Sequence, residues 1–150
     1  MQRRSLLLAI PALCATRAFG GSFTVTHSDA EWQTLLTPQQ YQVLRQSGTE
    51  TRNTSPLVQE HRKGTFFCAG CDLPLYSSDT KFESGTGWPS FWQPLDNAVA
   101  TKTDKSTAET RTEVHCSRCG GHLGHEFKDG PPPTGLRYCM NGVAMTFRAA

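Results

Sequence analysis

The sequence predicts a mainly β domain that begins with two short helices and is held together by two cysteine-containing turns. Three features indicate this class. Two helix-capping patterns lie close together near residue 30, short runs rich in Thr, Phe and Val follow residue 65, and the pattern Cys-x-x-Cys occurs twice. The chain has 150 residues, which is typical of one domain, and it contains no run of the roughly 20 apolar residues that a membrane-spanning helix requires.

Two short helices are expected before residue 49. Ser28 and Glu31 form a capping box, in which each side chain accepts a hydrogen bond from the backbone N–H of the other residue. Thr37 and Gln40 repeat the pattern, with a proline at the favoured first helical position between them. Gly48 is expected to end the second helix, because glycine readily adopts the left-handed conformation of a helix C-terminus.

The remaining elements are expected to be strands and loops. Strands are predicted at residues 65–67, at 110–115 and in two pieces of 136–147. The pair Asn141-Gly142 favours a type I′ hairpin turn between those two pieces. Residues 96–109 lack a clear period and are interpreted as a surface connection, 49–64 as a loop, and 21–27 as a disordered lead-in.

The two Cys-x-x-Cys pairs predict a metal site. A tight turn directs both sulfurs of a pair toward one point, and two such turns make a tetrahedral site that suits Zn²⁺. The predicted ligands are Cys68, Cys71, Cys116 and Cys119. We expect one structural zinc ion, because four thiolates leave no open position for a reacting water. Two disulfides, or one redox-active pair, are the alternatives that spacing leaves open.

The sequence has six cysteines, of which Cys14 falls in the first 20 residues and Cys139 has no place in the metal site. On a strand, Arg137 and Asn141 lie two residues to either side and therefore point to the same face. A nearby guanidinium stabilises a thiolate, so this pattern favours a reactive thiol. A buried, inert cysteine is the alternative.

Histidines and aromatic residues supply further candidates. His122 and His125 follow the second cysteine pair and suit proton donors near neutral pH; additional metal ligands or surface histidines are the alternatives. The segment 85–92 contains two tryptophans among glycine and proline turns. Such a cluster is interpreted either as core or as a pocket for an apolar, polarizable group such as a methyl thioether.

The first 20 residues are interpreted as an export signal that precedes the domain at 21–150. Arg3 and Arg4 stand before a short apolar run and small residues, an arrangement that also suits a twin-arginine leader and a periplasmic location. Three of the 15 basic residues lie in this segment and no acidic residue does, so the remainder carries 12 basic against 13 acidic side chains, a net charge of −1. This charge argues against a nucleic-acid-binding protein.

Four motifs together resemble one family. They are Cys68-Ala-Gly-Cys71, Gly87-Trp-Pro-Ser-Phe91, Cys116-Ser-Arg-Cys119-Gly-Gly-His-Leu-Gly-His125 and Arg137-Tyr-Cys-Met-Asn141. In this order they resemble the type B peptide-methionine-R-sulfoxide reductases, over about residues 28–148. The resemblance implies antiparallel β-sheets, a zinc ion away from the chemistry and Cys139 as the nucleophile. It also implies that Trp88 and Phe91 bind the substrate and that these residues surround the sulfoxide: His122, His125, Asp129, Arg137 and Asn141.

The resemblance further implies reduction of methionine R-sulfoxide through a cysteine sulfenic acid. The expected partners are oxidised proteins or peptides and a thiol reductant such as thioredoxin, and we expect a monomer. Many family members carry a resolving cysteine where this chain has Thr86, so an internal disulfide step is not expected here. The competing hypotheses are a non-catalytic zinc-stabilised β module with a tryptophan-lined pocket and a disulfide oxidoreductase that uses a Cys-x-x-Cys pair.

Overall fold

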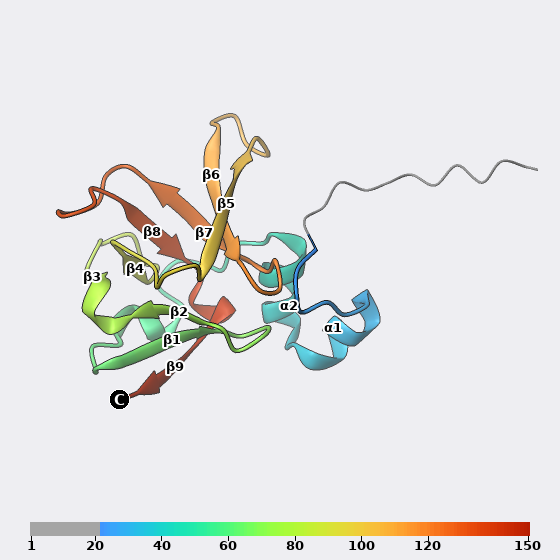
Figure 1. Cartoon of the computed structure of the whole chain (residues 1–150). Helices are drawn as coiled ribbons and strands as arrows, with labels where there is room; N and C mark the ends of the chain where they lie inside the picture. Colours follow the sequence, from blue (N-terminus) through green and yellow to red (C-terminus); the bar gives the residue numbers. More distant parts are fainter. Residues whose placement is uncertain (1–21) are drawn as a thin grey trace, which may run out of the picture.

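Two antiparallel sheets and two short helices make up the fold in a computed structural model that describes residues 22–150 (Figure 1). One sheet has three strands in the order β2-β1-β9, and the other has six in the order β3-β4-β8-β7-β6-β5. The strands are β1 (Gly64–Cys68), β2 (Pro74–Ser77), β3 (Lys81–Phe82), β4 (Ser90–Phe91), β5 (Val99–Asp104), β6 (Arg111–Cys116), β7 (His122–Phe127), β8 (Arg137–Met140) and β9 (Met145–Ala149). The predicted mainly β antiparallel class with short N-terminal helices is confirmed.

The helices are α1 (Asp29–Leu35) and α2 (Pro38–Gln46), and both predicted capping boxes are formed. The C-terminus of α2 differs from the prediction. Ser47, rather than Gly48, adopts the left-handed conformation (φ 54°), and Gly48 donates its N–H to the carbonyl of Gln42. Neither helix is long and apolar enough to cross a membrane, a finding that covers residues 22–150.

The lead-in to α1 is ordered, so the prediction of disorder was wrong for residues 22–27. Val25 donates its backbone N–H to the carbonyl of Arg118, next to the second cysteine pair. Phe23 lies edge-on to the ring of His115, with centroids 5.9 Å apart. The segment therefore packs on the turn that follows β6, which the local sequence did not indicate.

Strand β5 corrects the interpretation of residues 96–109 as a surface connection. It pairs along its whole length with β6, from Val99 opposite Cys116 to Asp104 opposite Arg111. Its four central residues are exposed, because β5 is the edge strand of the six-stranded sheet. An edge strand with no buried face has no apolar alternation, and this explains why its sequence has no recognisable period.

The predicted hairpin turn at Asn141-Gly142 was also wrong. Asn141 has φ −70°, whereas a type I′ turn needs positive φ at both central residues. The chain instead passes through the short 3₁₀ helix η3 (Gly142–Ala144), and β9 joins the three-stranded sheet. Strands β8 and β9 therefore belong to different sheets, and the segment between them connects the two.

The core contains large side chains from both sheets. Phe66 of β1 and Tyr76 of β2 both pack against Phe91 of β4, with ring centroids 4.9 and 4.3 Å apart. The Tyr76 hydroxyl lies 3.2 Å from the sulfur of Met140 in β8, and burial raises the pKa of Tyr76 well above its ordinary value. This packing fixes β8 against β4 and so determines where the residues between Arg137 and Met140 point.

Candidate active site and metal centre

The four predicted metal ligands lie together. Cys68 and Cys116 end strands β1 and β6, and Cys71 and Cys119 lie in the turns that follow. The sulfurs of Cys68 and Cys119 are 3.7 Å apart, those of Cys71 and Cys116 are 3.5 Å apart, and all four lie within 4.8 Å of one another. A tetrahedral site with zinc–sulfur distances of about 2.3 Å has sulfur–sulfur edges of about 3.8 Å. The cluster therefore fits Zn²⁺.

The same distances argue against the disulfide alternative. A disulfide brings two sulfurs to about 2.05 Å, and all four cysteines are free. The turns support the metal geometry, because Asp72 and Gly120 adopt positive φ (63° and 71°) just after the second cysteine of each pair. Arg118 donates from its guanidinium to the carbonyl of Cys71 and so joins the two turns.

The thiol of Cys139 lies in a row of side chains that crosses the six-stranded sheet. Directly paired residues on antiparallel strands point to the same face. Pairing places His125 of β7 on one side of Cys139 and Ser90 of β4 on the other. Beyond His125, the row continues through Glu113 of β6 to Lys102 of β5. This juxtaposition of His125 and Cys139 comes from the strand register.

Hydroxyl groups adjoin the thiol. The Oγ1 of Thr86 lies 3.8 Å from the Sγ of Cys139. The Oγ of Ser84 lies 2.9 Å from that Oγ1 and 2.6 Å from the Oγ of Ser90. The three hydroxyls thus form a chain of hydrogen bonds whose end at Thr86 is directed toward the sulfur. Ser84 and Ser90 were not singled out by sequence, since isolated serines carry no distinctive spacing.

Arg137 supplies positive charge to the same thiol. Its Nε and Nη2 donate to the two carboxylate oxygens of Asp129, at 2.8 and 2.9 Å, and its guanidinium lies 4.3 Å from the ring centre of Phe127. Burial raises the pKa of Cys139, while the Thr86 hydroxyl and the Arg137 guanidinium act in the opposite direction. Arg137 lowers the pKa of Asp129, so the carboxylate stays charged and holds the guanidinium in place.

The two candidate histidines are each paired with a carboxylate. His125 Nε2 lies 2.7 Å from Asp104 Oδ2, and His122 Nδ1 lies 2.8 Å from Glu113 Oε1. The two rings are 5.4 Å apart. His122 is only 3% exposed, and its Nε2 is buried with no hydrogen-bond partner among residues 22–150. Burial lowers the pKa of His122, so the ring is neutral at physiological pH.

The two aromatic candidates lie in different surroundings. Trp88 is half-buried and lies, with Ser84, in the wall of a hollow of about 110 Å³. Phe91 is fully buried against Phe66 and Tyr76 in the core. Its side chain has no exposed surface for a substrate, so the structure assigns it to packing, and Trp88 is the aromatic candidate that remains.

Asn141 and Glu50 together hold the loop that carries Trp88. Asn141 donates from Nδ2 to the carbonyl of Leu123 and accepts at Oδ1 from the N–H of Glu50. The carbonyl of Glu50 accepts from the indole N–H of Trp88 at 3.2 Å. Both polar atoms of Asn141 are therefore engaged in fixing neighbouring segments.

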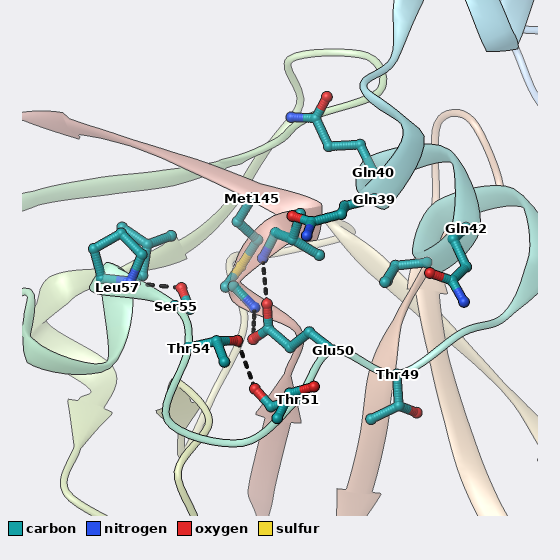
Figure 2. A pocket seen from close by; sticks show the side chains of 14 residues that line it. Gln39, Gln40, Gln42, Thr49, Glu50, Thr51, Thr54, Ser55, Leu57 and Met145 are labelled. Atoms are coloured by element: carbon teal, nitrogen blue, oxygen red, sulfur yellow. Dashed lines mark hydrogen bonds between the residues drawn. The ribbon is translucent and has the colours of Figure 1, made fainter.

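The Glu50 side chain lies at a cavity of about 660 Å³ between α2, the loop that follows it and η3 (Figure 2). Its carboxylate accepts from the backbone N–H groups of Gly142 and Val143, at 2.6 and 2.9 Å, and burial raises its pKa. Sequence reasoning missed Glu50 because it lies in a polar stretch that resembles an ordinary loop.

The model of the SelR domain matches residues 36–149, which include both cysteine pairs, Trp88 and Cys139. The chain belongs to the SelR domain family. Three of its relatives bear the name peptide methionine sulfoxide reductase MsrB. The one from Leptospira interrogans is 53% identical over 85% of this chain and 98% of its own length. The one from Agrobacterium fabrum is 53% identical over 82% of this chain and 92% of its own length. The one from Methanosarcina barkeri is 54% identical over 83% of this chain and 88% of its own length.

Proposed function

We infer that this protein reduces methionine sulfoxide in oxidised proteins or peptides to methionine, with Cys139 as the nucleophile. The observation that carries the proposal is the position of the Cys139 thiol. It lies between the Thr86 hydroxyl, the Arg137 guanidinium and the His125 ring. The chain also belongs to the SelR domain family, whose relatives named above are methionine sulfoxide reductases. A thiol, a cation and a titratable ring are the groups that nucleophilic attack and protonation of a leaving oxygen require.

The reaction transfers oxygen from one sulfur to another. The Cys139 thiolate attacks the sulfoxide sulfur, and the sulfoxide oxygen takes a proton. The resulting hydroxyl group then passes to the Cys139 sulfur, and the substrate S–O bond and the transient sulfur–sulfur bond both break. Methionine leaves with its sulfur reduced by two electrons, and Cys139, oxidised by two electrons, becomes a sulfenic acid. Arg137 and Thr86 favour the thiolate that starts this step.

His125 is the proton donor that the geometry favours over His122. It is the direct cross-strand partner of Cys139, and one of its ring nitrogens is free of Asp104. The ring of His122 is neutral, one of its nitrogens is bonded to Glu113, and the other is enclosed. We assign His122 to the support of the site.

Regeneration requires a reductant from outside the chain. An external thiol attacks the sulfenic sulfur, water leaves, and a second thiol then releases Cys139 from the mixed disulfide. Thr86 offers no sulfur, and the other cysteines among residues 22–150 are the four zinc ligands. A thioredoxin-like dithiol fits this need. Cys14 lies outside the described residues.

Separate R and S epimers of a methionine sulfoxide peptide test the proposal. We expect the wild-type protein to reduce the R epimer, as the family resemblance implies, and Cys139→Ser to be inactive while it keeps its zinc and its melting temperature. An inactive wild type with full zinc, or a Cys139→Ser variant that retains activity, would contradict it. Retained activity would also favour the non-catalytic or disulfide-exchange alternatives, which no structural observation supports at present.

We further propose that residues 1–20, which lie outside the described residues, direct export to the periplasm, and that the mature protein is a monomer. The paired arginines, the short apolar run and the difference in charge between this segment and the remainder support the proposal of export. Light scattering on the mature protein tests the second part.

A further inference from the structure

The geometry points to Asp104 as a positioning residue for the reduction: its carboxylate fixes which nitrogen of His125 carries the proton, and it stabilises the protonated ring. This inference rests on the proposed function. It concerns a residue of β5 that lies 35 positions from Cys139 in the sequence and belongs to none of the motifs.

Three groups hold the Asp104 carboxylate in place. Its Oδ1 accepts the backbone N–H of Ser106 at 2.8 Å. Its Oδ2 accepts from Nη2 of Arg111 at 2.9 Å and faces Nε2 of His125 at 2.7 Å. Hydrogen bonds from Ser106, His125 and Arg111 lower the pKa of Asp104, so the group is an ionised carboxylate that only accepts.

An acceptor at Nε2 determines the chemistry of the ring. Because Asp104 accepts there, Nε2 of neutral His125 carries the hydrogen, and Nδ1 keeps its lone pair. When the ring takes up a second proton, that proton resides on Nδ1. Nδ1 is then the donor to the sulfoxide oxygen, and the negative charge of Asp104 stabilises the resulting imidazolium.

The charges around His125 come from every strand packed against it. Asp104 lies on β5, and Arg111, its ion-pair partner, lies on β6. Glu113 is the cross-strand partner of His125 and forms an ion pair with Lys102 at 2.9 Å. The Cys139 thiol lies on the β8 side and His122 on the same strand. Among these groups, Asp104 is the carboxylate in hydrogen-bond contact with the His125 ring.

The Glu113–His122 pair shows what distinguishes the Asp104–His125 pair. In both, a carboxylate binds one ring nitrogen. The second nitrogen of His122 is buried without a hydrogen-bond partner among residues 22–150. His125 keeps 11% of its side chain exposed and stands opposite the thiol. The same pairing is therefore structural in one case and directed at the reaction in the other.

The test compares Asp104→Asn, which keeps the shape but loses the charge, with Asp104→Glu, which keeps the charge. Asp96→Asn is the matched control, because Asp96 is exposed and lies outside β5. Nitrogen-15 NMR of the resting protein identifies the tautomer of His125 without any substrate. Single-turnover methionine formation is followed from pH 6 to pH 9, with zinc content and melting temperature as fold controls.

In Asp104→Asn we expect the Nε2–H tautomer to lose its dominance and the single-turnover rate at pH 8 to fall about tenfold. Asp104→Glu should stay closer to wild type in both respects, and Asp96→Asn should match the wild type. A wild-type tautomer in Asp104→Asn, or equal losses of rate in the Asn and Glu variants with an unchanged pH profile, would overturn the inference. A wild-type protein that reduces no sulfoxide would instead refute the proposed function, and the NMR result would still decide the role of Asp104.

Discussion

Replacement of Thr86 by Val tests how the site produces a reactive thiolate. Val has nearly the same shape as Thr but lacks the hydroxyl that lies 3.8 Å from the Cys139 sulfur. A hydrogen bond to a charged acceptor contributes about 1.5–3 kcal/mol, and we take about 1 kcal/mol here because the contact is long. That energy corresponds to a change of about fivefold in the thiol–thiolate equilibrium.

The direction follows from the groups at the sulfur. Burial raises the pKa of Cys139, and the Thr86 hydroxyl and Arg137 oppose that rise. Loss of the hydroxyl therefore raises the pKa further, and less thiolate is present at neutral pH. Below the pKa we expect Thr86→Val to be alkylated at Cys139 about fivefold more slowly than wild type.

The assay measures alkylation by iodoacetamide from pH 6 to pH 10, with mass spectrometry of the Cys139 peptide to exclude the zinc ligands. Thr86→Ser is the matched control, because it keeps the hydroxyl, and it should resemble wild type. At high pH, where the thiol is ionised in every variant, the rates should converge. An identical pH profile for Thr86→Val and wild type would refute the hydrogen bond as a source of reactivity.

Three further predictions concern the metal, the recycling step and the leader. Cys116→Ser should lose zinc and about 4 kcal/mol or more of unfolding free energy, whereas Cys139→Ser should lose neither, as measured by metal analysis and denaturant titration. A metal-free protein as stable as the zinc form would contradict this. In the wild type, one equivalent of sulfoxide should give a sulfenic acid that dimedone traps, whereas Thr86→Cys should form a disulfide with Cys139 that peptide mapping detects. An internal disulfide in most wild-type molecules would exclude recycling by an external thiol. Mass spectrometry of the cellular protein should find the mature N-terminus near residues 19–21, and intact Met1 in most molecules would count against export.

The local parts of this protein could be predicted from its sequence. Capping boxes at Ser28 and Thr37 involve residues three apart, and the helices begin where these patterns indicate. The metal ligands were identifiable for the same reason, since each Cys-x-x-Cys turn brings two sulfurs together on its own. Cys139 was identifiable by exclusion, once four of the six cysteines were assigned to the metal and Cys14 to the leader.

The surroundings of the thiol needed the tertiary structure. His125 meets Cys139, and Asp104 meets His125, because antiparallel strands pair in one particular register. Nothing in the spacing of these residues fixes that register, and the exposed edge strand β5 gave no periodic signal at all. Sequence also left the two histidines equivalent.

The amino-acid sequence specifies the chemical groups of the two sites: four thiolates for zinc, the Cys139 thiol, two candidate histidines, an arginine and a tryptophan. Their roles come from the fold, because burial and hydrogen-bond partners depend on the packing of distant segments. Burial keeps His122 neutral, and Phe91 lies in the core. Strand pairing places His125 beside the Cys139 thiol. A group's chemistry is set by its solvation and its neighbours, and in a sheet most of those neighbours belong to other strands.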